Sequence, residues 1–280
     1  MEMTQEARSK GVKVSGRRKK QVIDQSSMLI EERRQHVLAT ISRDGRVLVS
    51  ELSDALGISR ITIRKDLAYL EERGMLQRTH GGALSPQNGA LLDPTLNEKA
   101  QHRLQEKHRI AEAAIKMVSE QQCVLLDSGS TTTMIARALR SFSSLTVITN
   151  AVNIAGELMA TNFEVMLTGG MLRRNSYSLV GPPAEDTLRD IHADILFLGV
   201  DGFDPASGIT TPNVLESRVN RAMVKVSRKV VAVCDSTKFS RRSFALIVPT
   251  SAVHAVITDK GISTADLDAL RNAGVEVIVV

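Results

Sequence analysis

Aromatic residues, cysteines and long apolar runs are all scarce in this 280-residue sequence. Aromatics make up 3% of it and tryptophan is absent, so few side chains are available to stack on single-stranded bases. The two cysteines, Cys123 and Cys234, are too few for a disulfide framework and too far apart for a metal knuckle, which predicts a reducing compartment. No stretch approaches the ~20 consecutive apolar residues of a membrane helix, and we expect no membrane partner.

Catalytic and metal-binding signatures are missing as well. The sequence contains no HExxH, GxSxG or CxxC motif, and its six histidines are scattered along the chain. The basic N-terminal tail lacks the apolar run of a secretory signal. We therefore expect a cytoplasmic protein that uses no metal and no other cofactor.

The chain does carry an excess of positive charge, and all of it lies at one end. The formal net charge is +5. Residues 1–90 contain 16 Lys and Arg against 11 Asp and Glu, whereas residues 91–280 contain 20 of each. Such asymmetry indicates a module for nucleic acid or an anionic surface, joined to a neutral module. Seven of the basic residues fall within residues 8–20, where a tail that only aids solubility is the alternative.

The length and the patterns along the chain predict two folded domains. At roughly 100–200 residues per domain, 280 residues fit two. Residues 1–27 are polar, basic and without a period, and we expect them to be disordered. Residues 28–84 form the first expected domain and residues 98–280 the second. Residues 85–97, with two prolines, two asparagines and a glycine, form the expected linker.

The first domain has the pattern of a winged helix-turn-helix. Two short helices joined by a tight turn at Gly57 and Ile58 match the helix-turn-helix, and the hairpin that follows would be the wing. The second helix of such a pair enters the major groove of DNA. The expected elements, in chain order, are a helix over residues 28–44, a β-like run over 47–49, a helix over 51–56 capped by Ser50, a helix from Ser59 to Gly74 and a hairpin over 75–84.

The second of these paired helices carries the side chains expected to read DNA. Its apolar stripe of Ile63, Leu67 and Leu70 faces the core, which leaves its polar side chains free. Arg forms bidentate contacts with guanine, whereas Lys and Ser more often hold phosphates. The alternative is a protein–protein module with a solvated basic face. The expected DNA contacts are Ser59, Arg60, Thr62, Arg64, Lys65 and Tyr69, with Arg78 and His80 on the wing.

Two short motifs carry a resemblance to a known family. Residues 33–84 closely resemble the winged helix-turn-helix of DeoR-family bacterial regulators, most specifically in SRITIRKDL (residues 59–67) and RTHGGA (residues 78–83). The likeness extends from about residue 28 to the end of the chain. It implies a repressor of carbohydrate genes, located in the cytoplasm at the bacterial nucleoid, that leaves its operator when a phosphorylated sugar binds. The subgroup that it resembles best controls amino-sugar (N-acetylgalactosamine-type) catabolism.

The second domain alternates strand-like and helix-like segments. Apolar strands that alternate with helices predict an α/β fold, with a mostly parallel sheet and helices on both faces. Helix-like stretches lie between most of the strands, as at Thr132–Arg140 and Leu215–Arg228. The expected strands are Cys123–Asp127, Leu145–Thr149, Phe163–Leu167, Ile195–Val200, Val230–Cys234, Ala255–Thr258 and Val275–Val280.

A hydroxyl-rich loop follows the first of these strands and opens a helix. Backbone N–H groups, hydroxyls and the helix dipole make such a loop a ready phosphate site. Its sequence is neither a Walker A nor a GxGxxG motif, so nucleotide binding is not indicated. A helix N-cap with spare hydroxyls is the alternative. The strand end and loop that we expect to bind an effector are Asp127, Ser128, Gly129, Ser130, Thr131 and Thr132.

Polar residues also follow the other strands, at the edge of the sheet where open α/β sheets bind ligands. Lys238 and Arg173 would neutralise a phosphate, and Asp201 and Asp235 would accept hydrogen bonds from sugar hydroxyls. The alternative is that each Asp is an ordinary turn residue. The expected effector contacts at these strand ends are Asn150, Gly169, Gly170, Arg173, Asp201, Asp235 and Lys238.

The sensor domain of the DeoR family is similar to ribose-5-phosphate isomerase. The GTGST-like phosphate loop of those enzymes matches residues 128–132, their D-G-x-D pair matches 201–204, and their D-x-S-K stretch matches 235–238. The catalytic Glu of the isomerase falls at about Asn220 and its catalytic Lys at about Thr211, and neither residue supplies the acid–base chemistry. The resemblance therefore implies a sugar-phosphate pocket without turnover.

Two alternative functions remain. One is an isomerase-like enzyme with an appended DNA-binding domain, whose base would be Asp201, Asp204 or Glu216. The other is an activator or architectural DNA binder that ignores small molecules. The expected partners are double-stranded operator DNA, a phosphorylated sugar and further copies of the chain, since a winged helix of this size reads a half-site and implies a dimer or tetramer.

Overall fold

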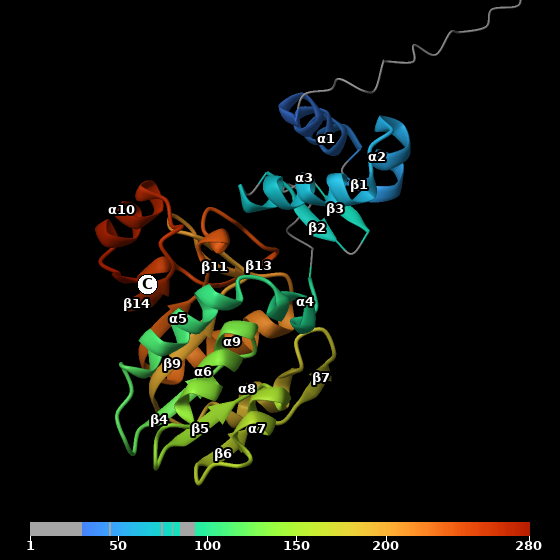
Figure 1. Cartoon of the computed structure of the whole chain (residues 1–280). Helices are drawn as coiled ribbons and strands as arrows, with labels where there is room; N and C mark the ends of the chain where they lie inside the picture. Colours follow the sequence, from blue (N-terminus) through green and yellow to red (C-terminus); the bar gives the residue numbers. More distant parts are fainter. Residues whose placement is uncertain (1–29, 45, 74, 80, 85–92) are drawn as a thin grey trace, which may run out of the picture.

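The computed structural model describes residues 30–44, 46–73, 75–79, 81–84 and 93–280. The expected basic tail, His80 and residues 85–92 of the expected linker lie outside the described residues. The elements before and after that linker form two separate groups, which Figure 1 colours along the chain.

The first group is a winged helix-turn-helix, as predicted. Strand β3 lies between β1 and β2 in a small antiparallel sheet. Side chains from the three helices and from this sheet share one apolar core, in which the predicted stripe of Ile63, Leu67 and Leu70 is buried. The elements are α1 (Ile30–Asp44), β1 (Arg46–Leu48), α2 (Val49–Leu56), α3 (Arg60–Glu72), β2 (Gln77–Thr79) and β3 (Gly82–Leu84).

The turn between α2 and α3 is fixed by local contacts. Gly57 ends α2 in the left-handed region with φ 64°, which a residue without Cβ adopts at little cost. Ser53 Oγ donates to the carbonyl of Ile58 at 2.7 Å and fastens the turn to α2. Ser59 caps α3 as predicted, because its Oγ accepts a hydrogen bond from the N–H of Thr62.

The start of α2 differs from the sequence prediction. The helix begins at Val49, so the prediction of Ser50 as its N-cap is wrong. The physical reason lies in the wing, because the N–H of Val49 donates to the carbonyl of Gly81 at 2.7 Å. That bond satisfies a free donor of the helix start without a side-chain cap. The wing approaches closely here, since a Cβ on Gly82 would lie 1.8 Å from the carbonyl oxygen of Val47.

The second group contains twenty-one short elements after the linker. In chain order they are α4 (Leu96–Gln101), α5 (Leu104–Ile115), β4 (Cys123–Leu126), α6 (Ser130–Leu139), β5 (Thr146–Thr149), α7 (Val152–Leu158), β6 (Glu164–Leu167), β7 (Met171–Arg173), β8 (Ser178–Val180), α8 (Pro182–Thr187), β9 (Ala193–Gly199), β10 (Gly202–Asp204), β11 (Gly208–Thr211), α9 (Val214–Val226), β12 (Ser227–Val233), η2 (Ser236–Lys238), β13 (Ala245–Val248), η3 (Thr250–Ala252), β14 (Ala255–Thr258), α10 (Thr264–Asn272) and β15 (Glu276–Val279).

Seven of these strands form one parallel sheet, and they are the seven strands that the sequence predicts. Their order is β15-β14-β12-β9-β4-β5-β6, and every neighbouring pair runs parallel. Parallel strands all end at the same edge of a sheet, so the segments that follow β12, β9 and β4 emerge side by side.

Helices cover both faces of this sheet, as predicted (Figure 1). Side chains of β4 alternate between two apolar cores: Val124 and Leu126 point into one, and Leu125 points into the other. Helices α5, α6 and α7 pack into the first core, and α8, α9 and α10 pack into the second. Burial on both faces explains why the strands read as continuous apolar runs rather than alternating ones.

Two smaller sheets were not predicted. Strands β7 and β8 form a hairpin, and β10, β11 and β13 form a three-stranded sheet. Strands of three or four residues are too short to carry a period of two. In the part of the chain that the structure describes, no helix has the length and apolarity needed to cross a membrane, no cluster of candidate metal ligands occurs, and both cysteines are free thiols.

Candidate functional site

The outer face of α3 carries most of the predicted DNA contacts. Arg60, Arg64 and Lys65 are exposed, and Thr62 is half-buried. Beside them Ile61 leaves 66% of its surface exposed, although the sequence analysis did not single it out. An apolar side chain at this position can contact the methyl group of a thymine. The signal for Ile61 was available, because it is an apolar residue outside the buried stripe of the helix.

Tyr69 has a structural role that its sequence position did not reveal. The guanidinium carbons of Arg34 and Arg73 lie 3.3 Å and 3.6 Å from the centroid of its ring. Two cations against one ring give favourable cation–π contacts. The ring thereby connects α1 to the end of α3, and we expect it to support the recognition helix rather than to contact a base.

A buried ion pair also fastens α3 to α1. Asp66 accepts hydrogen bonds from Nε of Arg33 and, at 3.2 Å, from Nε of Arg34. Asp66 and Arg33 are both buried. Since a buried charge is costly without its partner, this pair fixes how the recognition helix sits on the first helix.

The remaining predicted DNA contacts differ in their exposure and in the hydrogen bonds that they already make within the protein. Ser59 and Thr62 cap the helix through their hydroxyls, which lie 2.9 Å apart, and both stay near the surface. Arg78 is half-buried on β2, where its backbone N–H donates to Glu71 Oε1 at 3.0 Å. His80 lies outside the described residues, so its role stays a prediction.

A cavity lies at the carboxyl edge of the parallel sheet, and residues of α3 and β2 from the first group also line it. The segments that follow β4, β9 and β12 line it, together with side chains of α4, α5, β11 and α9. The predicted residues that line it are Asp127, Ser128, Gly129, Ser130, Thr131, Asp201, Asp235 and Lys238. Residues that line it without having been predicted as effector contacts include Lys99, Lys107, Thr211, Glu216 and Asn220 and, from the first group, Ala68, Glu71, Glu72, Gln77 and Arg78.

The loop after β4 presents several free donors to this cavity. The N-cap of α6 is Gly129, which has no side chain to bond the first turn. The first N–H groups of a helix have no acceptor within it, so those of Ser130 and Thr131 are available to an anion. The hydroxyls of Ser128, Ser130 and Thr131 make no hydrogen bond to the described residues. Thr132 differs, because it is buried and its hydroxyl donates to the carbonyl of Gly129 at 3.0 Å.

Lys238 is the predicted cation that remains available at this cavity. Its ammonium makes no ion pair or hydrogen bond with the residues that the structure describes. Nearby Asp235 caps η2, since its Oδ1 accepts from the N–H of Thr237 at 3.1 Å. Burial of Asp235 favours its neutral form, but the charge of Lys238 and the bonds from Thr237 outweigh this and lower the pKa of Asp235.

Asp201 carries an ion pair that was not foreseen. Its Oδ1 accepts a hydrogen bond from Lys99 Nζ at 2.6 Å, and its Oδ2 accepts one from Thr211 Oγ1 at 3.1 Å. Burial opposes ionisation of Asp201, but the positive charges of Lys99 and Lys238 lower its pKa. Asp201 is therefore ionised and has a donor on each oxygen.

Lys107 is a second cation that the sequence analysis missed. It is 3% exposed, and its Nζ donates to the backbone carbonyls of Lys99 and His102 at the end of α4. Burial lowers the pKa of Lys107 to about 8, although the charge of Asp235 acts in the opposite direction. Nothing in the local sequence indicates that Lys107 is buried.

Besides the buried Thr132, three further predicted residues do not line the cavity. Asn150 is fully buried and its Nδ2 donates to the carbonyl of Leu179 at 3.2 Å. Gly169 and Gly170 have φ values of 72° and 109° and lead into β7. The reason is the unpredicted β7–β8 hairpin, which bonds to the end of β5 through the N–H of Leu179 and the carbonyl of Asn150 at 2.6 Å.

Arg173 is also outside the cavity lining, because two carboxylates already hold it. Its Nη1 donates to Glu216 Oε1 at 3.0 Å, and its Nη2 pairs with Asp93. Ser176 Oγ accepts a third bond at 3.0 Å. With its charge engaged in this way, Arg173 lies behind the wall of the cavity rather than facing a ligand.

Comparison with known proteins adds family matches over most of the chain. Residues 33–88 match the DeoR-like helix-turn-helix domain, and residues 102–260 match the DeoR C terminal sensor domain. The chain is 40% identical to a putative aga operon transcriptional repressor of Escherichia coli O157:H7, over 89% of this chain and 93% of that protein. It is 39% identical to the HTH-type transcriptional regulator GlpR of Haloferax volcanii, over 90% and 98%.

Among solved structures, the second group of elements has distant counterparts. Ribose 5-phosphate isomerase A from Methanocaldococcus jannaschii is 15% identical, covers 48% of this chain with 53% of its own, and gives a TM-score of 0.36.

Proposed function

Because the chain belongs to the DeoR family of transcriptional repressors, with a helix-turn-helix DNA-binding domain followed by a sensor domain, we propose that it represses carbohydrate genes and that a phosphorylated sugar releases it from its operator. In this proposal the exposed face of α3 holds the operator. The cavity at the carboxyl edge of the parallel sheet holds the sugar phosphate. The protein acts in the cytoplasm.

The observation that carries the effector half of the proposal is the unpaired set of donors at the start of α6. The N–H groups of Ser130 and Thr131, three neighbouring hydroxyls and the positive end of the helix dipole converge on the cavity. Lys238 adds an available ammonium. Residues 91–280 have no net charge, so an anion must be captured by such local groups rather than by a general positive field.

The rest of the sugar would be recognised by carboxylates that line the same cavity as the loop after β4. Asp201 and Glu216 line the cavity and can accept hydrogen bonds from hydroxyl groups. The resemblance to the amino-sugar subgroup makes amino-sugar phosphates the first compounds to test. The relative named for the aga operon supports the same choice.

Release from DNA requires that the sugar phosphate distinguish two states of the protein. A ligand that binds both states equally well shifts no equilibrium, however tightly it binds. We therefore propose that the sugar phosphate binds best to a state in which the two DNA-binding domains of an oligomer no longer match their half-sites. A dimer or tetramer in solution, measured by sedimentation equilibrium, is part of this proposal.

Two measurements on the full-length protein test it. The first is a thermal-shift and calorimetry screen of sugar phosphates, in which a ligand at 100 times its dissociation constant stabilises the protein by about 2.7 kcal/mol. The second is binding to DNA from the region upstream of its own operon, compared with random DNA, with each compound added. The unphosphorylated sugar and inorganic phosphate are the controls. A protein that prefers no DNA sequence contradicts the repressor half, and one that responds to no sugar phosphate contradicts the effector half.

A further inference from the structure

Residues 93–99, which we call the entry segment, are the first described part of the chain after the DNA-binding domain. The segment is tied to the loop that joins β7 and β8. Asp93 pairs with Arg173 and accepts a hydrogen bond from Asn175 Nδ2 at 3.2 Å. The N–H of Leu96 donates to the carbonyl of Asn175 at 2.6 Å. These contacts fasten the start of the segment to the sensor domain.

The end of the segment is fastened at the cavity itself. Lys99 Nζ lies 2.6 Å from Asp201 Oδ1, and both side chains are about four-fifths buried, with 20% and 22% exposed. Lys107 Nζ donates a hydrogen bond to the backbone carbonyl of Lys99, and this contact also fixes the turn that follows the segment. Burial alone would lower the pKa of Lys99, but the charge and hydrogen bond of Asp201 raise it.

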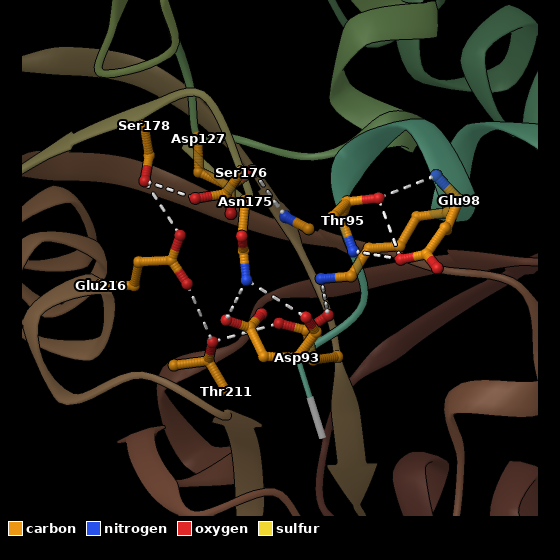
Figure 2. A network of polar contacts seen from close by, with 12 residues as sticks. Asp93, Thr95, Glu98, Asp127, Asn175, Ser176, Ser178, Thr211 and Glu216 are labelled. Atoms are coloured by element: carbon orange, nitrogen blue, oxygen red, sulfur yellow. Dashed lines mark hydrogen bonds and ion pairs between the residues drawn. The ribbon is translucent and has the colours of Figure 1, made fainter. Parts of the chain in front are cut away.

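A ring of side-chain contacts connects the two ends of the segment. Glu216 Oε1 accepts from Arg173 Nη1 at 3.0 Å. Thr211 Oγ1 lies 3.4 Å from Glu216 Oε2 and 3.1 Å from Asp201 Oδ2. Figure 2 shows Asp93, Thr211 and Glu216 within this network. In order around the ring stand Asp93, Arg173, Glu216, Thr211, Asp201 and Lys99.

Four of the six residues of this ring line the cavity and two do not. Lys99, Asp201, Thr211 and Glu216 line it, whereas Asp93 and Arg173 lie outside its lining. Lys99 donates to Asp201 Oδ1 and Arg173 donates to Glu216 Oε1, while Asp201 Oδ2 and Glu216 Oε2 share the single hydroxyl proton of Thr211. A sugar hydroxyl that bonds to either carboxylate therefore has to share or displace a contact of the ring.

We propose that the entry segment reads the occupancy of the effector site. A hydroxyl of the bound sugar phosphate takes the place of the Lys99 ammonium on Asp201, and the loosened segment no longer holds the DNA-binding domain in its operator-binding arrangement. This inference rests on the proposed function. The entry segment lies between the two family matches, residues 33–88 and 102–260, and belongs to neither.

Thermodynamic linkage between operator binding and sugar binding fixes the sign of the change in each affinity. If the closed ring is the operator-binding state, opening it at a point that the sugar does not touch weakens operator binding and strengthens sugar binding. Asp93 is such a point. Asp93→Asn keeps the size of the side chain and removes the charge that holds Arg173. Asp186→Asn is the matched control, because among the described residues Asp186 forms an ion pair with Arg189 alone, and this pair is exposed at the end of α8.

The experiment measures two dissociation constants for the full-length protein. One is that of the operator, with and without 1 mM of the sugar phosphate that releases the wild type, N-acetylgalactosamine 6-phosphate being tried first. The other is that of the same compound for the DNA-free protein. Coupling between two sites is typically about 5- to 150-fold. We expect Asp93→Asn to weaken operator binding in the absence of sugar, to bind the sugar more tightly and to lose at least about fivefold of the release ratio.

The possible outcomes distinguish a failure of this inference from a failure of the proposed function on which it rests. If the wild type is released but Asp93→Asn and Asp186→Asn are released equally well, the inference is overturned and the function stands. If no sugar phosphate releases the wild type, the proposed function is overturned and the inference with it. Hydrogen exchange of the wild type gives a reading that needs no variant. Amides of residues 96–101 should exchange faster with the sugar phosphate bound, and equal or slower exchange overturns the inference.

Discussion

Asn220 directs its side-chain amide at Asp127, with 3.5 Å between Asn220 Nδ2 and Asp127 Oδ2. Both residues are buried, and Asn220 Oδ1 has no partner among the described residues. Burial raises the pKa of Asp127 well above its ordinary value, against the effect of the N–H of Gly199, which donates to Oδ1 at 2.9 Å. A neutral carboxyl at Asp127 could donate its proton to Asn220 Oδ1 after a rotation of the amide, which an ionised carboxylate cannot do.

We predict that Asp127→Asn raises the stability of the protein at neutral pH. The folded state holds its proton to a higher pH than the unfolded chain, so the stability of the wild type falls as pH rises from about 4 through the folded pKa. The Asn variant lacks this cost and offers Asn220 a permanent donor. The variant should be more stable than the wild type at pH 7, and its advantage should shrink as pH falls toward 4.

Thermal unfolding between pH 4 and pH 7 measures this difference. A gain of about 1 kcal/mol corresponds to roughly 2–4 °C in Tm for a domain of this size. Asp186→Asn, at an exposed position, serves as the control and should not change Tm. A variant at Asp127 that is less stable than the wild type at pH 7, or a difference independent of pH, would contradict the assignment.

The neighbouring carboxylates are poorly suited to be the base of an isomerase. Asp201 pairs with Lys99, and Asp204 pairs with Arg242 at 2.6 Å. The pKa of each is lowered despite opposing desolvation, by the charge of Lys99 on Asp201 and by the hydrogen bond of Arg242 on Asp204. A general base works best with a pKa near the operating pH, so a lowered pKa weakens both. We predict no isomerase turnover.

A coupled assay across pentose and amino-sugar phosphates checks this prediction. The expected rate is that of the buffer alone. Turnover that disappears in Asp201→Asn would instead favour the enzyme alternative, in which the DNA-binding domain is an appendage. Asp204→Asn provides the comparison, because Asp204 does not line the cavity.

Arg64 is the exposed arginine of α3 that we expect to meet a base edge. Arg64→Ala should weaken binding to the operator by about 1–3 kcal/mol if Arg64 makes a bidentate contact with guanine. Random DNA should be bound almost as before. Fluorescence anisotropy on both DNAs measures the difference, with Arg189→Ala, an exposed arginine of the sensor domain, as the control. An unchanged operator affinity would remove Arg64 from the interface.

Asp66 tests how the recognition helix is held. Asp66→Asn keeps the shape of the side chain but leaves Arg33 buried without its counter-charge. Removing one partner of a buried pair costs roughly 3–5 kcal/mol. Glu31→Gln is the matched control, because Glu31 is exposed and its pair with Arg34 should contribute about 1 kcal/mol or less. Urea unfolding that ranks the two variants equally would contradict the structural role of Asp66.

The sequence predicts the main sheet well and the walls of the site poorly. The five inner strands of the parallel sheet are apolar runs buried on both faces, and the edge strands β6 and β15 are apolar but more exposed; such runs are visible without a structure. The β7–β8 hairpin has strands of three residues and leaves no pattern. This hairpin covers the end of β5. Asn150, which was predicted to face a ligand, is therefore buried.

The basic residues of the site likewise divide into one that the sequence locates at the cavity and two whose contacts it does not reveal. Lys238 lies five residues after the end of β12, so the strand prediction locates it at the cavity. Lys99 reaches Asp201 across 102 residues of sequence, and no local pattern encodes a contact at that distance. Arg173 appeared free to neutralise a phosphate, because its partners Asp93 and Glu216 lie 80 residues before it and 43 after it in the sequence.

The most direct test of the account is the release of operator DNA by sugar phosphates, followed by anisotropy for the wild type and for Lys238→Met. We predict that at least one sugar phosphate releases the wild type, whereas its unphosphorylated sugar does not. Loss of a charge-assisted hydrogen bond from Lys238 should raise the concentration needed for half-release about tenfold or more. A wild type that keeps its operator in the presence of every sugar phosphate, or a Lys238→Met variant released at the same concentration as the wild type, would contradict the account.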